Sequence, residues 1–324
     1  MRKNAMPGLQ APAGPTMAER FRALLDRPQG LELPGCYDAL SAMVLERAGF
    51  EAVFMSGYGL AASLLGNPDI GLTSLVETSA ATRNVASAIG VPLVVDADNG
   101  YGNEDNVVRT VTELEHAGAA AMILEDQVSP KRCGHAAGKQ IIPLDQYMRK
   151  LECALRARRT SLAVVARTDA TSIDEGILRA SRFHEAGADV VLIDGLASVE
   201  ALKRVGGEVP GHKVINLIHG GKTPLLAASE LHALGFKIVL YSTPALYTAT
   251  HTILHAMKLL RDSGRLESIS ACSVTFREFQ HWIESRYLAR DASEGLIPAS
   301  NAGRASGSTG ADTFGPSRRS APPC

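Results

Sequence analysis

The chain has 324 residues, 45% of them hydrophobic and 21% charged, and its formal net charge is -1. This composition is typical of a globular protein with a large apolar core, and the balanced charge argues against a basic surface that would hold nucleic acid through its phosphates. The odd number of cysteines without paired spacing and the lack of a long apolar run predict a cytoplasmic protein with neither disulfides nor a membrane segment.

Both ends of the chain differ in composition from its middle. Residues 1–17 contain Pro and Gly without periodicity, and residues 291–324 pass into Gly, Ser, Pro and Arg. Such segments bury too little apolar surface to fold on their own. We therefore predict a disordered leader over 1–17, a folded domain over 18–290 and a disordered tail over 291–324.

A repeated unit organises the middle of the chain: an amphipathic segment, a turn containing Gly, and a short apolar run typical of a buried parallel strand. The runs lie at 51–55, 92–95, 121–124, 162–166, 190–193, 214–217 and 238–241, the turn glycines are Gly49, Gly118, Gly187 and Gly235, and amphipathic helices are predicted at 104–116 and 173–185. This alternation over about 250 residues predicts an α/β fold, a (β/α)8 TIM-type barrel, with a doubly wound open sheet as the alternative.

Polar residues follow nearly every predicted strand at its carboxyl end. They are Tyr37, Asp38, Ser56, Gly57, Tyr58, Asp96, Asp98, Glu125, Asp126, Arg167, Asp169, Asp194 and Asn216. A barrel brings all of these ends to one face, whereas an open sheet would gather only those near its switch point, so the barrel is favoured. No phosphate-binding Gly-rich loop joins a strand to a helix, so a nucleotide cofactor is not supported.

Two pairs of acids stand at the exits of buried runs: Asp96 with Asp98, and Glu125 with Asp126. Crowded carboxylates in such a position either take up protons or gather around a hard divalent ion, and we favour Mg²⁺, with Mn²⁺ as a substitute. The alternative is that Asp98 and Asp126 only cap the helices that follow them.

Several motifs together resemble the isocitrate lyase and phosphoenolpyruvate mutase superfamily over about residues 18–285. The resemblance is closest to the branch that holds 2-methylisocitrate lyase, 2,3-dimethylmalate lyase, oxaloacetate hydrolase and carboxyphosphonoenolpyruvate phosphonomutase. The motifs are residues 37–39, 56–59, 67–69, 96–102, 125–127, 131–135, 167–170 and 220–224.

The resemblance implies a modified (β/α)8 barrel, usually a homotetramer with C-terminal helices exchanged between subunits, that binds a small carboxylate substrate with Mg²⁺. It implies Asp96 as the nearest metal ligand, with Asp69, Asp98 and Glu125 acting largely through metal-bound waters. The substrate pocket that it implies comprises Tyr37, Ser56, Gly57, Tyr58, Arg167, Asp194, Asn216 and His219. Backbone amides at 56–58 would position a substrate carboxylate and Arg167 would pair with one; a structural ion pair with Asp169 is the alternative for Arg167.

Cys133, with Lys131 and His135, is the implied catalytic group, protonating the carbanion that cleavage releases. Lys131, Arg132 and His135 are expected to lower the pKa of the thiol, and Gly134 with Gly138 to let the loop open and close over the site. The alternative for any single cysteine is an inert buried thiol.

Two positions depart from the pattern of the branch. Asp194-Gly195 replaces the usual Glu-Ala, and His219 replaces a Glu in the segment that begins at Asn216. We place both changes in the pocket, where His219 could pair with Asp194, and expect an altered substrate with the chemistry retained; loss of catalysis is the harsher alternative.

Three functions follow from the sequence. The first is a Mg²⁺-dependent carbon–carbon lyase that acts on a 2-hydroxy or 2-oxo di- or tricarboxylate and releases a keto acid such as pyruvate. The second is a phosphonomutase that forms a P–C bond. The third is a non-catalytic barrel retained as a binding or assembly subunit. Substrate identity cannot be predicted, because one methyl group is distinguished by only about 1 to 3 kcal/mol of pocket contacts.

Overall fold

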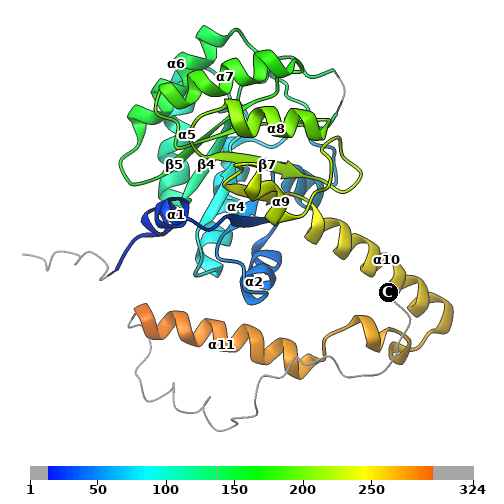
Figure 1. Ribbon diagram of the computed structural model, residues 1–324. Helices are drawn as coiled ribbons and strands as arrows, with labels where there is room; N and C mark the ends of the chain where they lie inside the picture. Colours follow the sequence, from blue (N-terminus) through cyan, green and yellow to red (C-terminus); the bar gives the residue numbers. More distant parts are fainter. Residues whose placement is uncertain (1–13, 137, 295–324) are drawn as a thin grey trace, which may run out of the picture. The chain divides into compact units, whose positions relative to one another are not determined.

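The structure is a computed structural model that describes residues 14–136 and 138–294. Within them, parallel strands pair in chain order and close into an eight-stranded barrel, because β1 also pairs with β8 (Figure 1). Closure confirms the predicted (β/α)8 barrel over the open sheet. The strands are β1 Leu31–Cys36, β2 Val53–Met55, β3 Leu93–Asp96, β4 Ala121–Glu125, β5 Ala163–Thr168, β6 Val190–Ile193, β7 Lys213–Leu217 and β8 Ile238–Tyr241.

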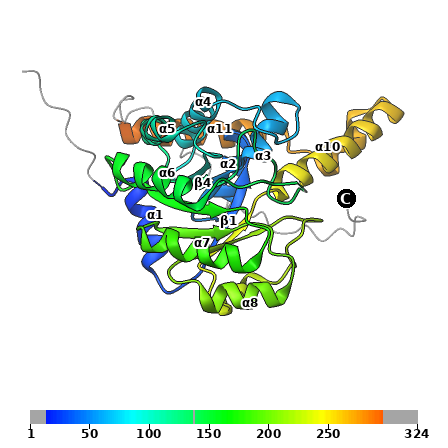
Figure 2. The same cartoon turned by 90° about the horizontal axis from the view of Figure 1, so that it is seen from above.

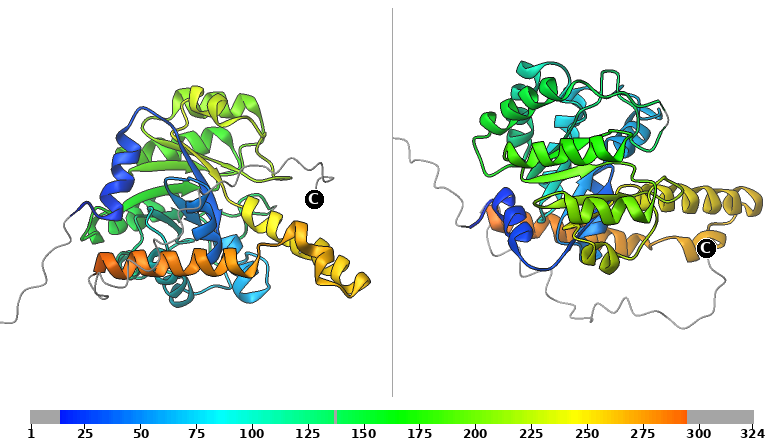
Figure 3. Two further views of the ribbon diagram at one scale, coloured as in Figure 1. Left: turned by 90° about the horizontal axis from the view of Figure 1, so that it is seen from below. Right: turned by 45° about the horizontal axis from the view of Figure 1, so that its top comes forward.

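Helices connect the strands and surround the barrel, as the views in Figures 2 and 3 show for α4 to α8. The helices predicted at 104–116 and 173–185 are α5 and α7. The helices are α1 Met17–Asp26, α2 Ala39–Arg47, α3 Gly57–Leu60, α4 Leu75–Ala88, α5 Glu104–Ala117, α6 Leu144–Ala157, α7 Ile173–Glu185, α8 Val199–Glu208, α9 Ala228–Ala233, α10 Pro244–Ser263 and α11 Phe276–Glu294, with a π-helical turn at Ala61–Leu65 and a 3-10 helix at Leu266–Cys272.

The four predicted turn glycines all adopt the left-handed backbone conformation, with φ between 93° and 98° at Gly49, Gly118, Gly187 and Gly235. Glycine has no Cβ and enters this region at little cost, so it ends a helix and redirects the chain into the next strand. The repeated unit read from the sequence is thus the helix-to-strand junction of the barrel.

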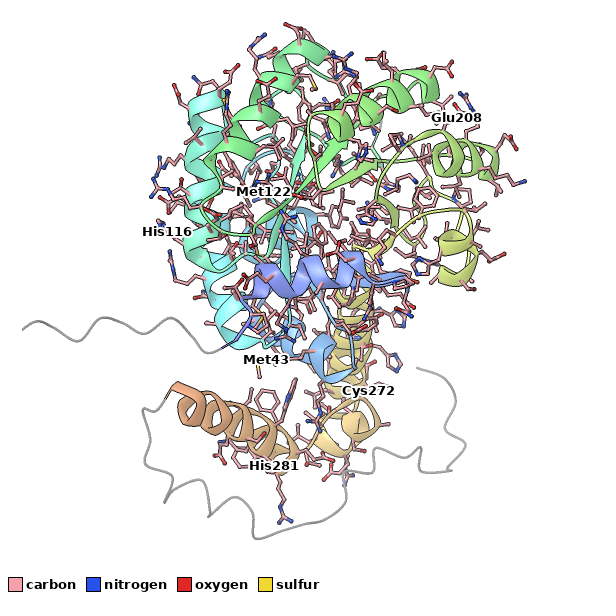
Figure 4. The ribbon with its side chains drawn as sticks, turned by 60° about the vertical axis from the view of Figure 1, so that its left-hand side comes forward. Met43, His116, Met122, Glu208, Cys272 and His281 are labelled. Atoms are coloured by element: carbon pink, nitrogen blue, oxygen red, sulfur yellow. The ribbon has the colours of Figure 1, made fainter. Side chains whose placement is uncertain are left out.

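Alternation along each strand separates two apolar layers. On β4, Met122 faces outward into the cluster shared with the helices, whereas Ile123 faces the interior of the barrel with Val94, Val165 and Leu192. Figure 4 shows Met122 inside the molecule and, by contrast, His116 on the outer surface of α5. Side chains that continue the inward alternation past the end of a strand therefore reach the mouth of the barrel.

The chain divides into two compact units, one ending at Tyr247 and one beginning at Thr248. The predicted domain over 18–290 therefore spans both units. Helix α1 already begins at Met17, after a capping box between Thr16 and Glu19, so the predicted leader is too long at its end. Its first 13 residues, and the predicted tail from 295 on, lie outside the described residues. In the described residues no helix is long and apolar enough to cross a membrane.

Candidate active site

The carboxyl ends of the strands place polar side chains on the inward alternation that the core residues set. Asp96 lies two residues after Val94, and Glu125 lies two residues after Ile123. Arg167, Asp194 and Asn216 stand at the same spacing after inward-facing apolar residues of β5, β6 and β7. All of these polar side chains except Glu125 line a cavity of about 30 Å³, room for roughly two water molecules. The polar residues that line it are Ser56, Tyr58, Asp69, Asp96, Cys133, His135, Arg167, Asp194, Asn216 and Ser242.

The four predicted acidic residues are all buried at this mouth. Lys131 Nζ lies 2.7 Å from both Asp69 Oδ1 and Asp98 Oδ1, so one ammonium joins two of the carboxylates. Although burial lowers the pKa of Lys131, the surrounding carboxylates, Asp98 first, raise it well above its ordinary value. Burial and the neighbouring acids raise the pKa of Asp98 to about 6 in spite of Lys131.

Asp96 is held by backbone rather than by a cation. Its Oδ1 accepts from the Asp98 N–H at 3.2 Å, and its Oδ2 accepts from the Gly57 N–H at 3.3 Å. A Cβ on Gly57 would stand 2.8 Å from Asp96 Oδ2, so only glycine allows this close approach. The Gly57 amide, expected to bind substrate, is therefore already engaged by Asp96.

Glu125 is the least satisfied of the acids. It is fully buried, and neither carboxylate oxygen has a hydrogen-bond partner among the described residues; Arg167 Nη2 lies 3.4 Å from Oε2. Burial raises the pKa of Glu125 well above its ordinary value. An orphaned carboxylate of this kind calls for a proton or a cation.

The donor set fits a hard cation held mainly through water. All four groups are carboxylates, the Gly57 N–H holds Asp96, and Glu125 accepts no hydrogen bond from the described residues, which together suit Mg²⁺ and its retained waters. Among the described residues, no three His, Cys, Asp or Glu side chains are close enough to ligate one ion directly. The four carboxylates therefore do not converge closely enough to coordinate one ion directly as a set.

Arg167 organises the opposite wall of the cavity. Its guanidinium lies 2.9 Å from Asp194 Oδ2 and contacts both oxygens of Asp169, at 2.9 and 3.1 Å. Asn216 Nδ2 donates to Asp194 Oδ1 at 3.1 Å, and Ser242 Oγ donates to Asn216 Oδ1 at 2.6 Å. Burial opposes ionisation of Asp194, but Arg167 and His135 hold its pKa well below the ordinary range. Arg167 therefore forms the structural ion pair with Asp169 and also lines the cavity.

The loop that carries Cys133 lies over the cavity. Cys133 is half-buried and lines the cavity together with Gly134 and His135. The expectation of a lowered thiol pKa is wrong: burial raises the pKa of Cys133, and Asp69 and Asp194 add to the effect. The positive charge expected from Lys131 is directed into the acidic cluster, away from the thiol, which therefore stays protonated and suited to donating a proton.

His135 and Lys139 attach the loop to the barrel. The Lys222 N–H donates to His135 Nδ1 at 3.0 Å, so Nδ1 carries no proton and Nε2 faces Asp194 Oδ1 at 3.4 Å without a well-aligned hydrogen bond. Lys139 Nζ donates to Asp169 Oδ1 at 2.9 Å and to the Asp194 carbonyl at 3.3 Å. The closed loop is thus tied to the Arg167 network.

Two expectations are corrected by this geometry. His219 is exposed and does not line the cavity, whereas Ile218 just before it does; the histidine beside Asp194 is His135. Tyr37 lies at the same end of the barrel but is not among the residues that line this cavity, so its binding role stays a prediction. Neither suggested helix cap forms: Asn103 caps α5, and Asp126 points outward to Thr168 and to Arg179 of α7.

Sequence reasoning missed Ser242 and Lys139. Ser242 follows Leu240 on the inward alternation of β8, a signal that could have found it. Lys139 gave no such signal, because its position depends on how the loop folds back over the site.

Fold and site together define the class: a (β/α)8-barrel enzyme whose mouth joins buried carboxylates to a cysteine-bearing loop. Residues 21–261 match the family described as phosphoenolpyruvate phosphomutase. The chain belongs to this family, within the isocitrate lyase and phosphoenolpyruvate mutase superfamily, which confirms the resemblance found in the sequence.

Relatives of this chain are lyases and mutases. It is 41% identical to 2,3-dimethylmalate lyase of Eubacterium barkeri, over 81% of this chain and 92% of that one. It is also 41% identical to the chloroplastic carboxyvinyl-carboxyphosphonate phosphorylmutase of Arabidopsis thaliana, over 82% and 80%. A crystal structure of 2,3-dimethylmalate lyase matches with a TM-score of 0.80 and 33% identity, over 87% and 96%. Phosphonopyruvate hydrolase, solved with oxalate and Mg²⁺, matches with a TM-score of 0.75 and 26% identity, over 87% and 100%.

Proposed function

We propose that this protein is a Mg²⁺-dependent carbon–carbon lyase. Its substrate would be a 2-hydroxy di- or tricarboxylate of the dimethylmalate or methylisocitrate type, cleaved to a keto acid such as pyruvate and a second carboxylate, or a 2-oxo acid of the oxaloacetate type, cleaved with water to two carboxylates. One observation carries the proposal: Cys133, Arg167, Asp69 and Asp96 line the same cavity. A proton donor, an anion-binding group and oxygen ligands for a cation are the parts that this cleavage needs.

The chain's own residues supply binding and proton transfer. Arg167, with its planar fork, and the Asn216 amide would bind a substrate carboxylate. In a 2-hydroxy acid the hydroxyl proton would leave to solvent and the hydroxyl oxygen would become the carbonyl of the keto acid. The electron pair of the broken carbon–carbon bond would stay on the carbon of the second fragment, and the Cys133 thiol would give its proton to that carbon. The thiolate then regains a proton from solvent. Raised by burial, the pKa of Cys133 suits this acid role.

Asp96 would be the nearest ligand of the ion, and Asp69, Asp98 and Glu125 would act through bound waters. When bound, Mg²⁺ would supply positive charge for the substrate alkoxide that becomes the carbonyl of the keto acid fragment. Two observations support this assignment: Glu125 accepts no hydrogen bond from the described residues, and phosphonopyruvate hydrolase was solved with Mg²⁺.

The loop must withdraw for substrate to enter, because a cavity of about 30 Å³ is smaller than a dicarboxylate. In the closed position the loop would exclude water from the cleavage step.

The test is an assay of the cleavage products: a 2-oxo acid from malate, citramalate, dimethylmalate and methylisocitrate, and oxalate from oxaloacetate, each with Mg²⁺, with Mn²⁺ and with a chelator. Release from one member of this panel that stops with chelator is the expected result. Absence of release from every member would reject the lyase.

A phosphonomutase is the second candidate, because the chain is as similar to the Arabidopsis phosphorylmutase as to the dimethylmalate lyase. Formation of a P–C bond from carboxyphosphonoenolpyruvate, followed by phosphorus NMR, would favour it over the lyase. A barrel without activity in either assay and without Mg²⁺ binding would support the non-catalytic alternative.

We also propose a cytoplasmic homotetramer with exchanged C-terminal helices. In the second unit α11 carries exposed apolar side chains, Phe276 at 82% among them, which are typical of a surface that another element covers. Sedimentation equilibrium of the full chain tests the assembly, and a monomer would reject it.

A further inference from the structure

Gln127 is a buried residue just past the end of β4 whose side chain reaches the loop above it. Its Nε2 donates to the Arg132 carbonyl at 2.8 Å, and its Oε1 accepts from the Arg132 N–H at 3.0 Å. A single amide thereby pairs both backbone groups of one loop residue, as a neighbouring strand would. The Arg132 side chain itself is exposed.

Arg132 stands between the two groups that the proposed mechanism uses. On one side the Lys131 ammonium reaches Asp69 and Asp98, and on the other Cys133 lines the cavity. Because Arg132 joins Lys131 to Cys133, holding its backbone in place also sets the positions from which those two side chains extend. Loss of that anchor would displace the ammonium and the thiol together.

Backbone hydrogen bonds hold the segment around Gln127 in place. Gln127 forms a β-bridge with Ile141, Val128 N–H donates to the Gln140 carbonyl at 3.0 Å, and Ile142 N–H donates to the Asp126 carbonyl at 2.9 Å. These bonds close the base of the loop without using the Gln127 side chain. The side-chain hydrogen bonds of Gln127, both to Arg132, therefore serve only to hold the loop.

We propose that Gln127 is a positioning residue for the catalytic loop. Its amide holds the Arg132 backbone so that Lys131 enters the acidic cluster while Cys133 faces the cavity. The roles of Lys131 and Cys133 rest on the proposed function, but the position of the loop can be measured without catalysis.

Alkylation by iodoacetamide, read at each cysteine by mass spectrometry, tests the proposal. In Gln127→Ala and Gln127→Glu we expect Cys133 to be alkylated about tenfold faster than in the wild type, because the amide donor to the Arg132 carbonyl is lost. Alkylation of Cys153 on α6 should not change, and kcat on the best substrate should fall more than KM rises. Gln140→Ala is the matched control, since the Gln140 side chain is exposed and only its backbone serves the loop base.

Cys133 alkylation within about twofold of the wild type in both variants would overturn the proposal. A general loss of structure can be told apart from displacement of the loop, because it would also expose the buried Cys36 to alkylation. If Gln127→Ala unfolds in this way, the Cys133 alkylation rate of the nearly isosteric Gln127→Glu decides the test. If no substrate is cleaved at all, the proposed function fails while the alkylation result still judges Gln127.

Discussion

Gly134 packs directly against the Asp194 carboxylate. A Cβ at position 134 would overlap both Asp194 Oδ2 and Arg167 Nη2. Neither side chain can move aside freely, because Asn216 holds Asp194 and Asp169 holds Arg167. Glycine at this position is therefore what lets the loop backbone close onto the anion-binding wall.

Gly134→Ala should lower keto acid turnover by about ten- to a hundredfold, the effect of overpacking a tight contact on the closed loop. The melting temperature should change little, because the loop lies outside the two apolar layers. Gly207→Ala on α8 is the control, since a Cβ there meets nothing within 4 Å. Wild-type turnover in Gly134→Ala would show that the loop does not close as described.

Cys133→Ser should abolish turnover, since a hydroxyl is a far weaker acid than a thiol, while Mg²⁺ affinity stays close to that of the wild type. The Mg²⁺-dependent assay and a calorimetric titration measure the two properties separately. Cys153→Ser, a half-buried cysteine on α6, should retain full activity. Retained turnover in Cys133→Ser would remove the thiol from the mechanism.

Cys133 should react as a thiol of raised pKa. Alkylation proceeds through the thiolate, and burial raises the pKa of Cys133, so its rate should still be increasing above the ordinary cysteine value of about 8.5. A pH series of iodoacetamide labelling, read at this residue, gives the midpoint. A midpoint below that value would restore the activated thiol expected from the sequence.

Of the two departures from the pattern of the branch, Asp194 should carry the effect on substrate choice. Asp194→Glu adds a methylene against Gly134 and Arg167, and we expect relative kcat/KM values across the acid panel to change by about tenfold. His219→Glu should leave the profile unchanged, because His219 is exposed. If His219→Glu alone shifts the profile, its placement outside the pocket is wrong for the working enzyme.

The sequence predicted the barrel and the inner ring of its mouth because both depend on short-range rules. Turn glycines such as Gly118 mark the junctions, and residues such as Glu125 and Arg167 follow buried strands at an inward position. Neighbouring strands then pair Glu125 with Arg167 in the observed register.

The loop contacts could not be predicted in the same way. Which histidine meets Asp194 depends on how residues 131–136 fold over the barrel, and no periodic pattern encodes that path. The expected lowering of the Cys133 pKa fails for the same reason, because Lys131, its neighbour in sequence, pairs with Asp69 instead of facing the thiol. Burial then outweighs the charge that sequence proximity suggested.

We propose above that the acidic cluster around Asp96 holds a divalent cation. Calorimetric titration of Mg²⁺ into the metal-free wild type and into Asp96→Asn tests it most directly, with Asp105→Asn on the first turn of α5 as a control on an acid outside the cluster. We expect saturable binding in the wild type and the control, and its loss in Asp96→Asn. No binding in the wild type, or equal binding in Asp96→Asn, would contradict it.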